Sequence, residues 1–206
     1  ATKVLLRDFT PVEILFSRFT LGFLALSCVP GGIHFTTFRN ELLFAGAGFS
    51  GVTLYFLFEN IALQYTLVSN VGILVTVAPF FTALLSRFFG KKEPLYPAFF
   101  IGFLLALGGI ALISFNGSVI LKLNPAGDIL AILAALVWAV YSIFMKRIGE
   151  LGYPMIPATR RVFFYGLLLM IPALFFMDFH PALRQMLKPV NLFNFAYLGL
   201  GASALC

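Results

Sequence analysis

The chain has 206 residues, of which 61% are hydrophobic and 11% are charged, and its formal net charge is +6. A soluble domain carries about twice this share of charged residues, so the composition argues against a soluble protein and for several membrane spans. The Lys and Arg residues lie mainly between apolar runs or near their ends, as at membrane borders, so we expect no nucleic-acid binding.

The sequence contains no pattern that indicates an enzyme. It has no HExxH, GxSxG, paired-acid or glycine-rich phosphate motif. Its two cysteines support neither a disulfide framework nor a metal cluster, because Cys28 lies in an apolar run and Cys206 is the last residue. We therefore expect no catalytic residues, no metal and no cofactor.

Apolar runs alternate with short polar segments along the chain. Residues 1–7 have the pattern of a helix tail, and residues 148–157 and 178–191 are expected to be loops. The expected spans cover residues 12–29, 42–63, 67–89, 95–115, 128–145 and about 162–177, and a last apolar run begins near residue 192. These boundaries predict an all-α polytopic membrane protein with six complete spans and a partial one at each end. We therefore expect the chain to be a fragment.

Residues 54–85 are expected to form a helical hairpin with a polar turn around residues 64–66. The first run carries the adjacent Glu59 and Asn60. The second run carries small or polar residues spaced three and four apart, namely Ser69, Gly72, Thr76, Pro79, Ala83 and Ser86. This spacing places them on one helix face, which we expect to contact protein because the rest of the run is apolar.

Two sets of residues recur along the chain and predict an internal repeat. The first set, Lys3, Pro11 and Arg18, recurs 143 positions later at Lys146, Pro154 and Arg161. The second set, Gly46, Gly48 and Ser50, recurs 153 positions later at Gly199, Gly201 and Ser203. Because five spans separate Lys3 from Lys146, the second copy must be inverted in the membrane, as in many secondary transporters.

The distribution of basic residues predicts the orientation in the membrane. Eight Lys and Arg residues lie in loops 30–41, 86–94 and 146–161, whereas the opposite loops carry five. Because positive charge is enriched on the cytoplasmic side, we expect the first set of loops to be cytoplasmic.

Several motifs occur in a fixed order along the chain. They are the run FENIALQY at 58–65, Pro79, Glu93, Gly102, the glycine pair at 108–109, and the run ALVWAVY at 135–141. In this order and spacing the chain resembles EamA-type exporters of the drug/metabolite transporter superfamily over essentially its whole length. The first run resembles the third helix of that family, and the last run resembles the start of its second copy.

The resemblance implies ten helices in two inverted five-helix halves, with both termini cytoplasmic and a central cavity that opens alternately to either side. Residues 1–115 would form the first EamA repeat, lacking most of its first helix. Residues 128–206 would form the second repeat, truncated within the eighth helix.

Family members move metabolites, amino acids or drugs, so the resemblance implies a secondary transporter that exports such a solute across the cytoplasmic (inner) membrane. It implies a small-molecule substrate, a lipid bilayer and, as one option, protons as the coupling ion. A homodimer is compatible with the resemblance. A flippase-like carrier of a lipid-linked substrate is the main alternative. A membrane-embedded enzyme or a scaffold is less favoured.

Several residues are candidates for the transport pathway. Glu59 could couple transport to protons or face the substrate, because ionisable groups inside spans usually face a cavity, or it could anchor the helix end near water. Asn60 could bind substrate or link helices. Thr76 and Pro79 lie near mid-membrane, where a proline frees a backbone carbonyl.

The remaining candidates lie on other spans. Trp138, Tyr141 and Ser142 could line the cavity, or Trp138 could fill a gap in the core. Arg18 shares a helix face with Gly22, so we expect it to point towards protein in a structural role, within reach of the interface. Lys3 and Glu93 are likewise assigned structural or charge roles.

Overall fold

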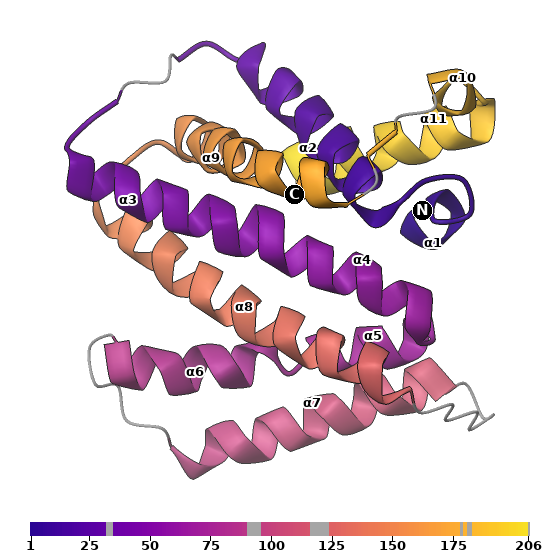
Figure 1. Cartoon of the computed structure of the whole chain (residues 1–206). Helices are drawn as coiled ribbons and strands as arrows, with labels where there is room; N and C mark the ends of the chain where they lie inside the picture. Colours follow the sequence, from indigo (N-terminus) through magenta and orange to yellow (C-terminus); the bar gives the residue numbers. More distant parts are fainter. Residues whose placement is uncertain (32–34, 90–95, 116–123, 178, 181–182, 206) are drawn as a thin grey trace.

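The computed structural model describes residues 1–31, 35–89, 96–115, 124–177, 179–180 and 183–205, and among these residues it contains helices and no strand. The elements are α1 (Thr2–Leu5), α2 (Pro11–Ser27), α3 (Phe38–Ala47), η1 (Gly48–Leu54), α4 (Tyr55–Tyr65), α5 (Val68–Val75), α6 (Ala78–Phe89), α7 (Pro97–Phe115), α8 (Pro125–Glu150), α9 (Met155–Phe176), α10 (Leu183–Met186), α11 (Pro189–Ala196) and η2 (Tyr197–Leu205). The segments η1 and η2 are π-helical. The predicted all-α fold is confirmed (Figure 1).

Four helical segments of the described chain are long and apolar enough to cross a membrane. They are Phe38–Tyr65, which joins α3, η1 and α4, then Val68–Phe88, Pro125–Glu150 and Met155–Phe176. Helix α2, with 17 residues, is shorter than these segments. The expected number of six complete spans therefore stays a prediction.

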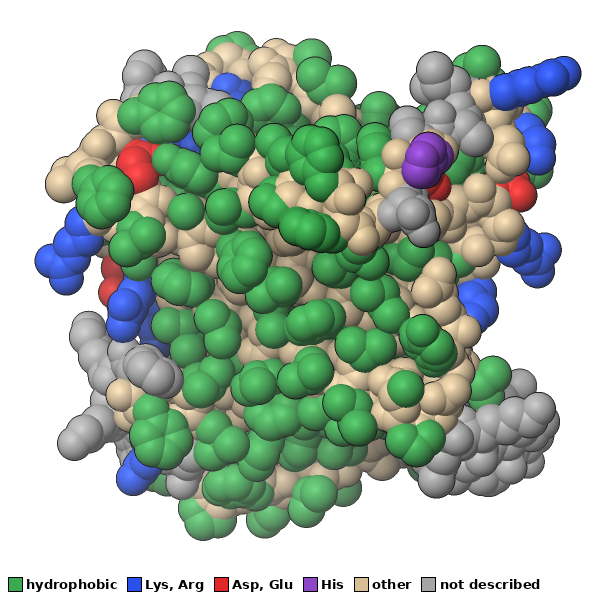
Figure 2. All heavy atoms as spheres, viewed as in Figure 1, with side chains coloured by type: hydrophobic (Ala, Val, Ile, Leu, Met, Phe, Trp, Pro, Cys, Tyr) green, Lys and Arg blue, Asp and Glu red, His purple; other side chains and the backbone are tan. Residues whose placement is uncertain are grey.

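The helices run between two ends of the bundle. At the first end, which comprises residues 28–31, 35–41 and 147–161, the Tyr153 hydroxyl donates to Thr36 Oγ1 at 3.1 Å. At the second end, which comprises residues 1–11, 64–70 and 124–128, Asn124 donates to the Tyr65 carbonyl at 2.9 Å. Between the ends, Figure 2 shows a face covered by hydrophobic side chains, with charged side chains towards its two margins. This distribution is typical of an apolar belt in lipid.

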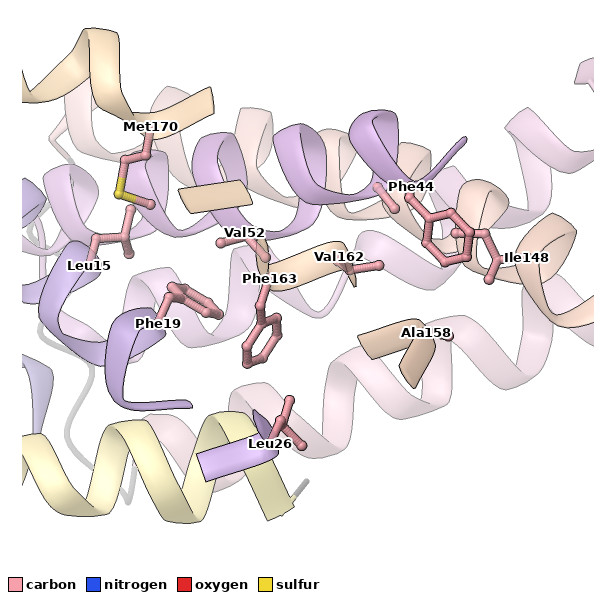
Figure 3. Packing of buried hydrophobic residues seen from close by; sticks show 11 residues of the cluster. Leu15, Phe19, Leu26, Phe44, Val52, Ile148, Ala158, Val162, Phe163 and Met170 are labelled. Carbon is pink, nitrogen blue, oxygen red and sulfur yellow. The ribbon is translucent and has the colours of Figure 1, made fainter. Parts of the chain in front are cut away.

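The main core joins α2, α3, η1, α8 and α9. Phe19 and Phe163 pack edge to face with ring centroids 5.0 Å apart, and Leu15, Val52 and Met170 lie in the same buried cluster (Figure 3). Because these residues come from helices far apart in the sequence, the core holds the first and last thirds of the chain together.

Helix α9 lies directly against η1, and α2 lies against η2. At the first of these crossings a Cβ atom on Gly48 would lie 2.5 Å from the backbone nitrogen of Gly166 and 2.6 Å from the Val162 carbonyl oxygen. Thr53 Oγ1 donates to the Gly166 carbonyl at 2.9 Å across the same contact. The two backbones approach this closely because Gly48 has no side chain.

Three expectations about local structure are wrong. The expected loop at 148–157 is mostly helical, because α8 continues to Glu150 and α9 begins at Met155. Pro154 is the N-cap of α9 and Pro157 lies in its first turn, where proline is tolerated. The expected loop at 178–191 contains α10 and the start of α11.

The third correction concerns the small and polar face of the second hairpin helix. The helix is interrupted between α5 and α6, where the Thr76 hydroxyl donates to the Ile73 carbonyl at 2.6 Å and Pro79 supplies no N–H. Because the interruption breaks the regular spacing, the expected stripe does not pack as one face. Val71 and Ala78 are buried instead, whereas Gly72 and Pro79 are exposed.

Candidate functional site

Five polar and aromatic side chains from three helices form what we call the central cluster. Arg18 comes from α2, Tyr55 and Glu59 from α4, and Trp138 and Tyr141 from α8. Residues four or three apart share a helix face, which brings each pair on α4 and α8 to the same side. The packing of α8 against α4 is aided by fully buried alanines on α8, namely Ala131, Ala134, Ala135 and Ala139.

The aromatic members of the central cluster form a continuous wall. The ring centroids of Tyr55 and Trp138 are 4.6 Å apart, and those of Trp138 and Tyr141 are 4.9 Å apart. Tilted aromatic contacts at this distance are favourable and keep the rings in place. The wall therefore offers an apolar surface of tilted aromatic rings, bordered by two hydroxyls and an indole N–H.

Arg18 is held inside the protein at one side of this wall. Only 8% of the residue is exposed, and its guanidinium lies 4.1 Å from the centre of the Phe56 ring. Its Nε donates to Ser203 Oγ at 2.6 Å. The expectation that Arg18 points towards protein is confirmed, but its side chain is buried among α2, α4 and η2 rather than extended to the membrane surface.

The polar ends of the central cluster have unused hydrogen-bonding capacity. To the described residues, the Glu59 carboxylate, the hydroxyls of Tyr55 and Tyr141, the Trp138 indole and the two terminal nitrogens of Arg18 make no hydrogen bond. None of these atoms is completely enclosed by protein. Arg18, Glu59 and Tyr55 interact electrostatically, but Arg18 and Glu59 form no direct ion pair. Because polar groups in protein interiors normally have partners, this arrangement favours a ligand or water among them.

The other described candidates on α1, α4 and α8 each make at least one hydrogen bond within the protein. Asn60 is 1% exposed, and its Nδ2 donates to the Pro11 carbonyl at 3.4 Å, which links α4 to α2. The Ser142 hydroxyl donates to the Trp138 carbonyl of its own helix at 2.9 Å. Lys3 donates to the Leu63 carbonyl in the last turn of α4. Glu93 lies outside the described residues.

Thr76 and Pro79 line a separate groove between the α5–α6 interruption and α7. The groove has a volume of about 580 Å³, and its other lining residues are Ala98, Phe99, Gly102, Phe103, Ala106 and Leu107. Thr76 supplies the one side-chain polar group among these lining residues. The structure therefore separates Thr76 and Pro79 from the central cluster.

A polar network at the first end is not predicted by the sequence. Glu41 on α3 accepts hydrogen bonds from the Thr36 backbone N–H at 2.8 Å and the Tyr165 hydroxyl at 2.7 Å, and it forms an ion pair with Arg161 on α9. The neighbouring Arg160 donates to carbonyls at the end of α2, including that of Val29 at 2.6 Å. The adjacent arginines Arg160 and Arg161 could have indicated a polar network, but their partners lie more than a hundred residues away in the sequence.

Comparison with known proteins decides the family. The sequence model of the EamA-like transporter family matches residues 1–115 and 125–206. The chain belongs to the EamA-like transporter family. Through this family it belongs to the drug/metabolite transporter superfamily, as the resemblance predicted.

This EamA-family chain is similar to two curated proteins that are themselves uncharacterized transporters. One, from Archaeoglobus fulgidus, is 29% identical over 175 residues, which is 82% of this chain and 59% of that protein. The other, YdfC of Bacillus subtilis, is 27% identical over 200 residues, which is 95% of this chain and 62% of that protein. The chain thus spans about three fifths of the length of these relatives.

A solved structure, described only as the crystal structure of a protein, has the same fold. It matches this EamA-family chain with a TM-score of 0.70 at 21% identity, over 96% of this chain and 67% of that one.

Among the described residues, no group of His, Cys, Asp and Glu is arranged to hold a metal ion.

Proposed function

We propose that the protein is a secondary transporter that exports a small metabolite, amino acid or drug across the cytoplasmic membrane by alternating access. The observation that carries the proposal is the central cluster, in which charged and aromatic side chains gather between helices and keep several polar atoms without a hydrogen bond to the described residues. Such groups are costly inside a membrane and usually mark a substrate or ion pathway.

We further propose that residues 1–115 and 128–206 are inverted halves that rock against each other. The exchanged packing supports this, because α2 of the first segment lies against η2 of the second, and α9 of the second lies against η1 of the first. Helix pairs related in this way can tilt together around a site between them.

A flux assay tests the proposed activity. The full-length protein would be reconstituted into liposomes loaded with labelled amino acids, other metabolites or cationic drugs, and exchange against unlabelled solute would be measured. We expect saturable exchange of at least one solute class. A lipid-linked substrate is the second candidate, favoured by the apolar groove beside Thr76, and it predicts movement of a labelled lipid between leaflets instead.

We expect Glu59→Gln to alter the pH dependence of transport, because Glu59 has no fixed hydrogen-bond partner among the described residues and can exchange a proton as the site opens. Flux would be measured across pH and normalised to folded protein. If the variant keeps the parent's pH profile, Glu59 is structural. The matched control is Glu150→Gln, which changes an exposed carboxylate at the first end.

We expect the first end to face the cytoplasm. In a full-length protein without other cysteines, an impermeant thiol reagent applied to intact cells should label Leu187→Cys and leave Leu151→Cys unlabelled. Both positions are exposed, at 73% and 45%, so a difference in labelling reports sidedness rather than burial. Labelling of Leu151→Cys alone would reverse the orientation.

A further inference from the structure

We propose that Arg18 recognises the carboxylate of a small, singly charged solute with a flat apolar body, and that Arg18 thereby determines the specificity of the central cluster. This assignment rests on the proposed transport function and adds a chemical class of substrate to it.

The guanidinium of Arg18 is held in one orientation. Its Nε is occupied by Ser203 at 2.6 Å, and one of its faces is covered by Phe56 at 4.1 Å. The two terminal nitrogens remain without a hydrogen-bond partner among the described residues, although Arg18 is only 8% exposed. This edge of a guanidinium matches the two oxygens of a carboxylate in a bidentate pair.

The charge of Arg18 has no direct ion-pair partner among the described residues. A buried cation without a direct counter-ion is unfavourable, and here Glu59 compensates Arg18 only from a distance. A ligand carboxylate would supply the direct partner that Glu59 does not. The negative charge of Glu59 would also repel a second charge on the ligand, so the site favours a monoanion over a dianion.

The central cluster also provides an aromatic surface beside Arg18. Tyr55 and Trp138, whose ring centroids are 4.6 Å apart and whose planes are tilted by 53°, form an aromatic surface with hydrogen-bonding groups at its edge. A flat aromatic ring can stack on one of these rings or pack against it edge to face, so the surface favours a planar apolar body attached to the carboxylate.

The test uses Trp138 as a built-in reporter, because it is the only tryptophan in this sequence. The full-length protein in nanodiscs, with any tryptophan outside residues 1–206 changed to phenylalanine, would be titrated with 3-phenylpropionate and with the neutral 3-phenylpropionamide. We expect a saturable change in Trp138 emission for the acid and an affinity about tenfold lower for the amide. Equal affinities would overturn the assignment.

Two variants are expected to change the binding of the acid in opposite directions. Arg18→Gln should abolish the preference for the acid over the amide, whereas Glu59→Gln should strengthen binding of the acid by removing the competing charge. Arg184→Gln removes an exposed arginine and should leave both affinities unchanged. If Arg18→Gln does not fold, Glu59→Gln decides the matter. Unchanged or weaker acid binding by Glu59→Gln would contradict the proposal.

Two further arms identify the source of the carboxylate and separate the two proposals. Oleate in the nanodisc tests a lipid-borne carboxylate, and an effect of oleate without a saturable effect of 3-phenylpropionate would overturn a soluble ligand. Flux of other solutes without any preference for the acid over the amide would refute only the role of Arg18. Absence of flux for every solute would refute the transport function itself.

Discussion

Gly48→Ala is expected to destabilise the protein by about 3 kcal/mol, although alanine is the better helix former. The added Cβ would lie 2.5 Å from the Gly166 nitrogen and 2.6 Å from the Val162 carbonyl oxygen. Both are backbone atoms that no side-chain rotation can move away. The helices η1 and α9 must therefore separate, and the contacts of Val52 and Phe163 in the core would loosen with them.

The measurement is the unfolding of purified protein in one detergent, together with the fraction that is monodisperse after extraction. Gly149→Ala is the matched control, because a Cβ there would meet no atom within 4 Å. We expect the control to be as stable as the parent or slightly more stable. A Gly48→Ala protein with the parent's stability would show that the crossing is looser than the structure indicates.

The second large effect is expected at the ion pair between Glu41 and Arg161. The side chains are only 14% and 3% exposed, and Arg161 also stacks on Phe44 with its guanidinium 4.3 Å from the ring centre. Arg161→Met would leave the Glu41 carboxylate buried without a counter-ion, which typically costs about 3–5 kcal/mol. We expect this loss of stability in the same unfolding measurement.

A double-mutant cycle separates the ion pair from its surroundings. Glu41→Gln combined with Arg161→Met should cost less than the sum of the two single variants, because the double variant leaves no unpaired charge. The pair between Lys188 and Asp8 is the control, with side chains 57% and 33% exposed at 3.6 Å. Lys188→Met should cost about 1 kcal/mol or less. Strict additivity at Glu41 and Arg161 would contradict the predicted coupling.

The network around Glu41 also bears on how the protein could move. It ties α3 to α9 at the first end, where Arg160 holds the end of α2 as well. At the second end Asn191 donates to Asp8 at 2.8 Å, a bond that lowers the pKa of this exposed carboxyl. If the halves rock, opening at the first end must break the buried network around Glu41. We therefore expect variants of Glu41 to favour opening at this end.

The sequence alone determined the class of the protein and its local features. The composition requires a membrane environment, because a chain with this share of hydrophobic residues cannot bury all of its apolar surface in its own core. The hairpin turn near residue 66, the expected facing of Arg18 towards protein and the shared face of Trp138 and Tyr141 also follow from the sequence. They depend on helical periodicity and turn chemistry within a few residues.

Only the tertiary structure decided how those local features combine. Arg18 donates a hydrogen bond to Ser203, which lies 185 residues further along the chain, and Arg161 donates one to Glu41 across a separation of 120 residues. Likewise, the packed face of α5 and α6 is not the regular stripe of small residues, because the interruption at Thr76 breaks the spacing. Helical periodicity predicts which residues share a face. Which helix packs against that face depends on how helices distant in the sequence dock.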